Sequence, residues 1–306
     1  MTTMNRRRFL LGSAAALGAM AAADASAVAE SVSQPLSVGT PVTLGGTGIR
    51  GGLVGLGTGV RSWNGQSELT RKGKRAYMEM LEYAWDRGIR YFDMADMYGS
   101  HDYVREALRK TGGRDEAMLL TKAVSRDPTL LRADLERFRH ELDTDCLDVV
   151  LMHCITDQDG ADWTQQLSGC MAVLEEAKER GILRAHGVSC HSLEALRIAT
   201  QHPWVDVILA RINPFGVKMD GPVEAVAPLL EAAHASGKGV IGMKIVGEGE
   251  LSDRIPESLR FALGLECLSA MAVGFSLPDQ IDQMERLLRS MGTVDTASGR
   301  RNVRPA

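Results

Sequence analysis

Four polar side chains of types that can move a proton stand out in this sequence: Asp93, Tyr98, Lys122 and His153. All but Tyr98 close short strand-like runs, which cover residues 90–93, 118–122 and 147–153. The runs follow one another at about 30 residues, the length of one strand, one helix and their turns. A carboxylate, an ammonium and an imidazole at successive strand ends are typical of the rim of a (β/α)8 barrel. With a phenol beside them, these groups could deliver a proton to a carbonyl oxygen.

Carbonyl reduction by hydride transfer would use each of the four groups. The nascent alkoxide needs a proton, and a tyrosine with its ordinary pKa near 10 gives one up inefficiently at neutral pH. A nearby ammonium lowers the pKa of a phenol, and Lys122 is spaced to do so. We therefore expect Tyr98 to be the acid/base, with Asp93 fixing Lys122. We expect His153 to donate a hydrogen bond to the substrate oxygen.

The elements that must position these groups are alternating strand-like and helix-like segments. The expected strands are 53–57, 90–94, 118–122, 147–153, 185–189, 205–212, 239–245 and 271–275. The expected helices are 72–86, 101–110, 128–142, 163–180, 192–200, 222–236, 258–265 and 278–290. Asp127 and Pro128 form a typical start for the third helix. Eight units predict an α/β fold, a (β/α)8 TIM barrel, because a doubly wound sheet has fewer units.

The glycine-rich stretch 46–51 fits the pattern G-x-G-x-x-G letter by letter. A dinucleotide-binding fingerprint requires a strand, a tight turn and then a helix. In this sequence the glycines continue past residue 51 and a strand follows. We therefore predict that residues 41–52 form an N-terminal β-hairpin that covers the bottom of the barrel.

The motifs around the four polar residues resemble the catalytic tetrad of the aldo-keto reductases. The resemblance rests on the segment 92–99, on Thr121-Lys122 and on His153, and it extends over residues 42–290. It implies a barrel that binds NADP(H) or NAD(H) and reversibly reduces an aldehyde, a ketone or a sugar-derived carbonyl, with Tyr98 as the acid/base. An alternative is a nucleotide-binding redox sensor or partner subunit with negligible turnover. The intact tetrad favours the enzyme.

The same resemblance implies a set of cofactor-binding residues. Gly187-Val188-Ser189 matches a segment that holds the nicotinamide, although Cys190 replaces the usual asparagine. Gly274–Gln280 resembles the segment for the adenosine phosphate but lacks its usual lysine and arginine. Lys244 could meet the pyrophosphate or form an internal ion pair. The implied cofactor residues are Gly57, Thr58, Ser189, Asn213, Lys244, Ser276 and Gln280.

The first 27 residues are typical of a twin-arginine export signal, with Arg6-Arg7 before an apolar stretch and Ala25-Ser26-Ala27 as a cleavage site. The apolar stretch has about 15 residues, whereas a membrane span needs about 20. An uncleaved anchor is the alternative, and the mature protein is expected to have no stable span. The export machinery is then an expected partner, and the location is periplasmic or exported. We expect a linker at 28–41, the barrel at 42–291 and a flexible tail at 292–306.

Composition and cysteine spacing argue against nucleic acid and metal ions as binding partners. The net charge is −4 and the pI is about 6.0, so no basic field invites nucleic acid. The five cysteines include no C-x-x-C pair, and the histidines at 186 and 191 lack a ligand motif, so no metal site is expected. Cys154 and Cys190 could lie close enough to bridge, but free thiols are favoured.

Overall fold

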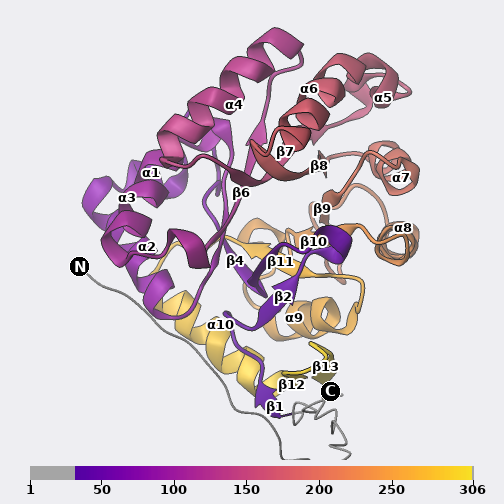
Figure 1. The fold of residues 1–306 in the computed structure, drawn as a ribbon. Helices are drawn as coiled ribbons and strands as arrows, with labels where there is room; N and C mark the ends of the chain where they lie inside the picture. Colours follow the sequence, from indigo (N-terminus) through magenta and orange to yellow (C-terminus); the bar gives the residue numbers. More distant parts are fainter. Residues whose placement is uncertain (1–31, 305–306) are drawn as a thin grey trace, which may run out of the picture. The chain divides into compact units, whose positions relative to one another are not determined.

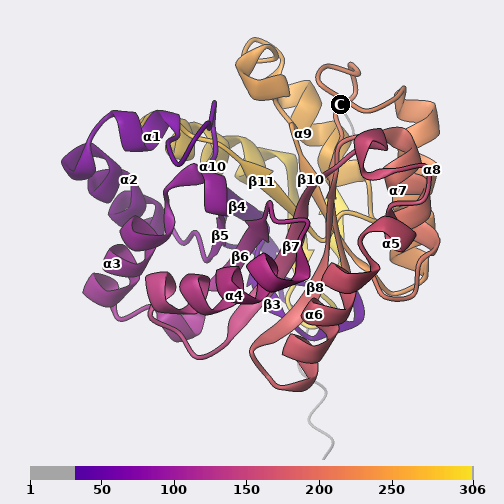
Figure 2. The same ribbon diagram turned by 90° about the horizontal axis from the view of Figure 1, so that it is seen from above.

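The computed structural model describes residues 32–304, and these form a closed barrel of eight parallel strands surrounded by helices (Figure 1; Figure 2). The barrel strands are β4 (Val54–Gly57), β5 (Tyr91–Asp93), β6 (Met118–Ala123), β7 (Leu147–Ile155), β8 (Leu183–Cys190), β9 (Val207–Arg211), β10 (Gly239–Met243) and β11 (Ala270–Val273). Each pairs with the next along the chain, and β11 closes the ring against β4. The predicted (β/α)8 fold is confirmed.

Eight long helices follow the barrel strands, one after each. They are α2 (Lys74–Asp86), α3 (His101–Thr111), α4 (Pro128–Leu142), α6 (Ser168–Glu179), α7 (Leu193–Gln201), α8 (Val223–Ala235), α9 (Ile255–Gly264) and α10 (Pro278–Met291). The start of α4 is as predicted, because the Asp127 carboxylate accepts hydrogen bonds from the backbone N–H groups of Thr129 and Leu130. The short helices α1 (Glu68–Arg71) and α5 (Trp163–Gln166) were not predicted as separate elements.

The hairpin predicted at 41–52 is confirmed, as β2 (Pro41–Thr43) pairs antiparallel with β3 (Arg50–Gly52). Its connection carries Leu44 and Ile49, both fully buried, into the apolar cluster inside the barrel. Burying one such side chain stabilises the fold by roughly 1.5–3 kcal/mol. A second and larger cluster lies between the strands and the helices. The hairpin therefore closes the end of the barrel opposite the carboxyl ends of the strands.

The expectations of a linker at 28–41 and a flexible tail at 292–306 were wrong for the parts that the structure describes. Strand β1 (Ser33–Pro35) pairs with β12 (Gly292–Asp295), which pairs with β13 (Arg301–Val303). Leu36 and Val38, which follow β1, are fully buried. These strands have three or four residues each and lack a clear alternation of polar and apolar side chains. Their stability comes from pairing between distant segments, which local sequence patterns do not reveal.

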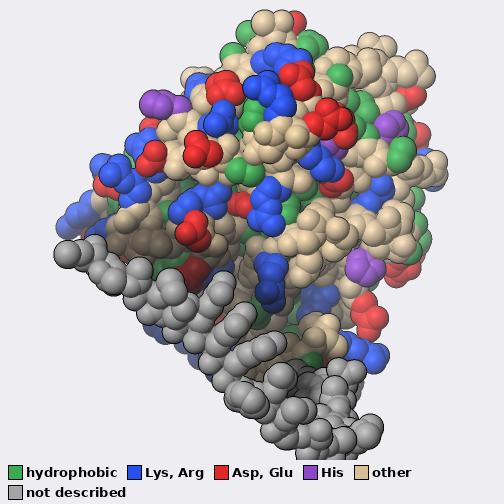
Figure 3. Space-filling view, in the orientation of Figure 1, with side chains coloured by type: hydrophobic (Ala, Val, Ile, Leu, Met, Phe, Trp, Pro, Cys, Tyr) green, Lys and Arg blue, Asp and Glu red, His purple; other side chains and the backbone are tan. Residues whose placement is uncertain are grey.

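The export signal predicted at 1–27 lies outside the described residues. Within residues 32–304, no helix has the length and apolar character needed to cross a membrane. On the face shown in Figure 3, lysine and arginine side chains are interspersed with aspartate and glutamate side chains. Ion pairs also form within single helices, as Arg137 on α4 pairs with Asp134 and Glu141 of the same helix.

Candidate active site

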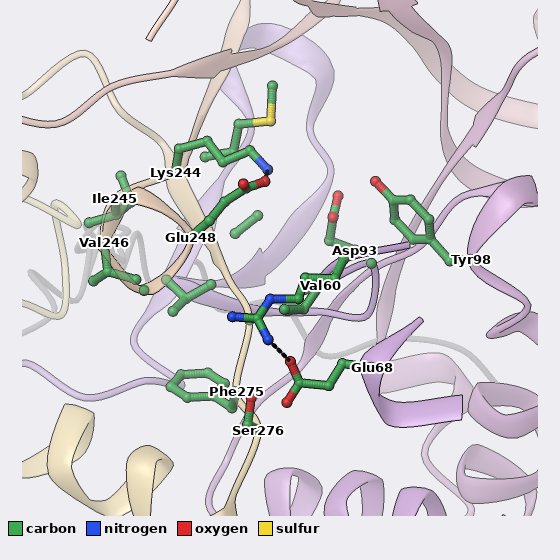
Figure 4. Close-up of a pocket in the computed structure, with 18 of the residues that line it drawn as sticks. Val60, Glu68, Asp93, Tyr98, Lys244, Ile245, Val246, Glu248, Phe275 and Ser276 are labelled. Atoms are coloured by element: carbon green, nitrogen blue, oxygen red, sulfur yellow. Dashed lines mark hydrogen bonds and ion pairs between the residues drawn. The ribbon is translucent and has the colours of Figure 1, made fainter. Parts of the chain in front are cut away.

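Asp93, Tyr98, Lys122 and His153 meet at one end of the barrel, as predicted. Three of them lie at or near the carboxyl ends of β5, β6 and β7, and parallel neighbours bring these ends to one rim. Tyr98 comes from the single turn η2 (Asp96–Tyr98) that follows β5. All four line one cavity of about 300 Å³. Figure 4 shows Asp93 and Tyr98 side by side at its wall.

The Lys122 ammonium is held by two bonds in the buried wall. Its Nζ lies 2.8 Å from Asp93 Oδ1 and 2.7 Å from the carbonyl oxygen of Met94. A lysine ammonium has three N–H donors, so one N–H remains. Nζ also lies 5.0 Å from the centroid of the Tyr98 ring. Burial lowers the pKa of Lys122, and the Asp93 carboxylate opposes this shift. The carboxylate and the ammonium thus hold each other in place, as expected.

The pKa of Tyr98 moves against the prediction. Burial raises it well above the ordinary value of 10, and the Asp93 carboxylate adds to the rise. Desolvation penalises the phenolate, and the ammonium expected to counter this is already paired with a carboxylate. In the free cavity Tyr98 is therefore a protonated phenol at neutral pH.

His153 lies next to Tyr98, with its Nε2 3.4 Å from the phenolic oxygen. Burial, followed by the charge of Lys122, lowers the pKa of His153 to about 2. The ring is therefore neutral at physiological pH. The guanidinium of Arg126, which sequence reasoning missed, donates to the His153 carbonyl oxygen at 2.8 Å and pairs with Asp159. These bonds fix the end of β7.

A second layer holds the Tyr98 loop against the barrel. The Thr58 hydroxyl lies 2.9 Å from the carbonyl oxygen of Asp93 and 3.0 Å from the Ser100 hydroxyl. Gly99, next to Tyr98, has a left-handed backbone with φ of 63°, which glycine adopts at little cost. The side chain of Thr58 is buried and does not line the cavity. In the structure the Thr58 hydroxyl supports the loop, and its contact with a cofactor stays a prediction.

Comparison with known proteins places the chain in a family. The Aldo/keto reductase family matches residues 55–262. The chain belongs to this family. Its members are oxidoreductases that use NAD(P)(H). The match covers β4 to α9 and includes all four residues of the tetrad.

The chain has low sequence identity to individual aldo-keto reductases. The chain is 24% identical over 210 residues to D-threo-aldose 1-dehydrogenase from Pseudomonas sp, covering 58% of this chain and 62% of the relative. It is 23% identical over 195 residues to the aldo-keto reductase yakc (NADP(+)) from Schizosaccharomyces pombe, covering 58% and 54%. The chain thus spans less than two thirds of either relative. The solved aldo-keto reductase AKR11C1 from Bacillus halodurans, holo form, has a TM-score of 0.66 and 18% identity, covering 81% of this chain and 90% of that one. This last likeness concerns the fold.

Five of the seven cofactor residues implied by the aldo-keto reductase resemblance line the cavity: Gly57, Ser189, Lys244, Ser276 and Gln280. The side chains of Lys244 and Gln280 are held by neighbouring groups of the chain. Lys244 forms an ion pair with Glu248, one of the two alternatives foreseen for it. The Gln280 Oε1 accepts the backbone N–H groups of Ser276 and Leu277 and so caps α10.

Asn213 does not line the cavity, contrary to expectation. Its Nδ2 donates to the carbonyl oxygens of Val217 and Lys244, and its Oδ1 accepts from the N–H groups of Phe215 and Val217. The side chain is fully buried and its donors and acceptor are used. Asn213 therefore ties the loop after β9 to the end of β10.

The cavity carries four ionisable residues that sequence reasoning did not assign to it: Arg61, Glu68, His191 and Glu248. Arg61 and Glu68 pair at 3.8 Å. Glu68 lies near Ser276, on the opposite side of the cavity from Lys244 and Glu248 (Figure 4). His191 alone had a signal in the sequence. It stands two residues after Ser189, so the alternation of side chains along a strand predicts the same face for both.

The cavity wall fits a nicotinamide nucleotide in its chemistry. Leu209, Met243 and Ala272 offer apolar surface for a ring. The Ser189 hydroxyl, which accepts the backbone N–H of Cys154 at 2.8 Å, still has its own proton to donate. Lys244 offers a cation for a phosphate. Among residues 32–304, no group of three His, Cys, Asp or Glu side chains could hold a metal ion, and all five cysteines, Cys154 and Cys190 included, are free thiols.

Proposed function

We propose that this protein is an NAD(P)(H)-dependent oxidoreductase that reversibly reduces an aldehyde, ketone or sugar-derived carbonyl to an alcohol. The observation that carries the proposal is the Tyr98 phenol, set in a cavity wall between a neutral imidazole and the buried Lys122–Asp93 pair. Such a wall has one neutral group that can give a proton and a cation that can stabilise the anion left behind. Sugar-derived carbonyls are included because one relative is an aldose dehydrogenase.

The residues divide the chemistry among them. His153 has a buried Nδ1 without a hydrogen-bond partner in the described chain. The tautomer with its proton on Nε2 avoids a buried N–H without an acceptor. Nε2–H can then orient the substrate carbonyl oxygen next to the Tyr98 hydroxyl. Bound nicotinamide nucleotide would supply the hydride. Tyr98 gives its proton to the developing alkoxide, and Lys122 stabilises the phenolate that remains.

The test is the variant Tyr98→Phe. It removes the proton donor and leaves the ring in place, so kcat for an aldehyde should fall at least about 100-fold. The dissociation constant for NADPH, measured by nucleotide fluorescence, should stay within about twofold. The control is Tyr103→Phe, because Tyr103 lies half-buried on α3 outside the cavity lining. Near wild-type turnover by Tyr98→Phe would overturn the assignment. Nucleotide binding without any turnover by the wild-type protein would favour the redox sensor.

Export is the second part of the proposal. Residues 1–27 would act as a twin-arginine signal, and the protein would cross the membrane already folded and would work in the periplasm. Supporting this are the Arg6-Arg7 pair, the short apolar stretch after it and the small residues at 25–27. A pathway for folded proteins would suit an enzyme that takes up its cofactor before crossing.

A further inference from the structure

His191 faces the same cavity as Tyr98 and His153. It comes directly after β8, and Ser189, two residues earlier, lines the cavity with it. Cys190, between them, is fully buried and packs among the residues between the strands and the helices. The alternation of the strand thus presents Ser189 and His191 together. The tetrad does not use His191.

The proton on His191 is placed by a fixed chain of charged groups. Arg211 Nη2 lies 2.5 Å from His191 Nδ1, and Arg211 Nη1 lies 3.0 Å from Asp220. A guanidinium can only donate hydrogen bonds, so Nδ1 must be the acceptor. The neutral ring then carries its proton on Nε2. Burial and the charge of Arg211 lower the pKa of His191 to about 3, which keeps this neutral form at physiological pH.

Among the described residues 32–304, the Nε2–H of His191 has only a weak partner. Nε2 lies 3.5 Å from the sulfur of Cys154, and a thiol sulfur is a weak acceptor. An oxygen atom that enters the cavity is a better acceptor. The His191 ring centroid lies 6.4 Å from that of His153. A hydrogen bond spans about 3 Å, so the two rings can each bind one of two oxygens carried by neighbouring carbons.

We propose that His191 binds a second substrate oxygen and makes the site selective for carbonyls that carry a hydroxyl or oxo group on the adjacent carbon. The reacting oxygen lies at Tyr98 and His153, and the adjacent oxygen accepts from His191. The inference rests on the proposed function and narrows its substrate class. A site with an N–H donor for a substrate hydroxyl rejects an analogue without that hydroxyl, because the buried N–H is then left without an acceptor.

The test compares substrates that differ in the adjacent oxygens. Reduction of glyceraldehyde is compared with that of propanal, and methylglyoxal serves as the oxo analogue. The wild-type protein should prefer glyceraldehyde over propanal by kcat/KM at least about tenfold. In His191→Leu this ratio should fall about tenfold or more, mainly through the KM for glyceraldehyde. His191→Gln keeps an N–H donor and should recover part of the ratio, which also keeps the test valid if the leucine variant folds poorly.

Two controls separate a role in substrate selection from a general loss of activity or of nucleotide binding. His234→Leu changes an exposed histidine of α8 and should leave the reduction of glyceraldehyde and of propanal unchanged. The NADPH dissociation constant of His191→Leu should stay within about twofold. The inference would be overturned if His191→Leu kept the wild-type ratio of kcat/KM for glyceraldehyde over propanal. It would also be overturned if this variant lost NADPH binding without a change in that ratio. Either result would leave the proposed function standing. No reduction of any of the three carbonyls by the wild-type protein would overturn both.

Discussion

Lys244 and Glu248 form an ion pair inside the cavity, and this pair must open before Lys244 can hold an anionic group. The hydrogen bond from Lys244 lowers the pKa of Glu248, which keeps the carboxylate charged at neutral pH. The carboxylate therefore competes with any phosphate that approaches the lysine. Glu248 thus sets a limit on the affinity of the site for a charged cofactor.

The variant Glu248→Gln should bind NADPH more tightly, by about threefold to tenfold, because it frees the Lys244 ammonium and removes a negative charge from the cavity. Nucleotide fluorescence titration at low ionic strength measures the change, and added salt should reduce it. The matched control is Glu250→Gln, since Glu250 pairs with Lys218 and does not line the cavity. Weaker binding by Glu248→Gln would mean that Glu248 itself contacts the nucleotide.

The sequence was informative about some of these residues and silent about others. Asp93, Lys122 and His153 close apolar strands, so their meeting at one rim followed from the fold. The sequence left open whether Lys244 meets a pyrophosphate or forms an internal ion pair, because Lys244 and Glu248 lie in a loop where both have left-handed backbone, each with φ of 58°. The raised pKa of Tyr98 depends on burial, which spacing does not reveal.

The loop between β4 and α1 packs its backbone against Tyr98, the proposed proton donor. A methyl group added at Gly59 would lie 2.3 Å from two ring carbons of Tyr98. The tyrosine ring approaches this close because residue 59 has no side chain. The loop therefore helps to fix the orientation of the Tyr98 side chain.

Gly59→Ala should lower kcat/KM about tenfold to a hundredfold, because the methyl group displaces the Tyr98 ring and a shift of about 1 Å can have an effect of this size. The melting temperature should change little, since the ring lies at the edge of a cavity and can move. Enzyme kinetics and thermal unfolding together check both parts. Gly264→Ala is the control, because nothing lies within 4 Å of the added methyl group there. Full activity in Gly59→Ala would contradict the role given to the loop.

Helices and strands were predictable from the sequence where each has a local sequence pattern of its own. The eight β/α units follow from alternating apolar strands and amphipathic helices, and α4 has its predicted limits because Asp127 and Pro128 mark its start. The sheet β1–β12–β13 was not predicted. Its short strands have partners at the other end of the chain, and pairing at that distance leaves no periodic signal.

At the scale of the whole molecule, the export proposal predicts a change of location. Changing Arg6-Arg7 to Lys-Lys should move the protein from the periplasm to the cytoplasm, because the pathway recognises the arginine pair. Fractionation of cells followed by immunoblotting measures this. Arg8→Lys, next to the pair, is the matched control and should still be exported. Unchanged export of the double variant would rule out the twin-arginine signal.

The sheet that joins both ends of the described chain has a consequence for the order of folding. Strand β1 is among the first described segments to leave the ribosome, whereas β12 and β13 are among the last. The barrel itself also closes late, because β4 waits for β11. A nascent chain therefore cannot finish either structure before these late strands have been made. Completion of the fold therefore requires residues up to Val303, so a route that accepts only folded cargo would reject a copy truncated before β11 or β12.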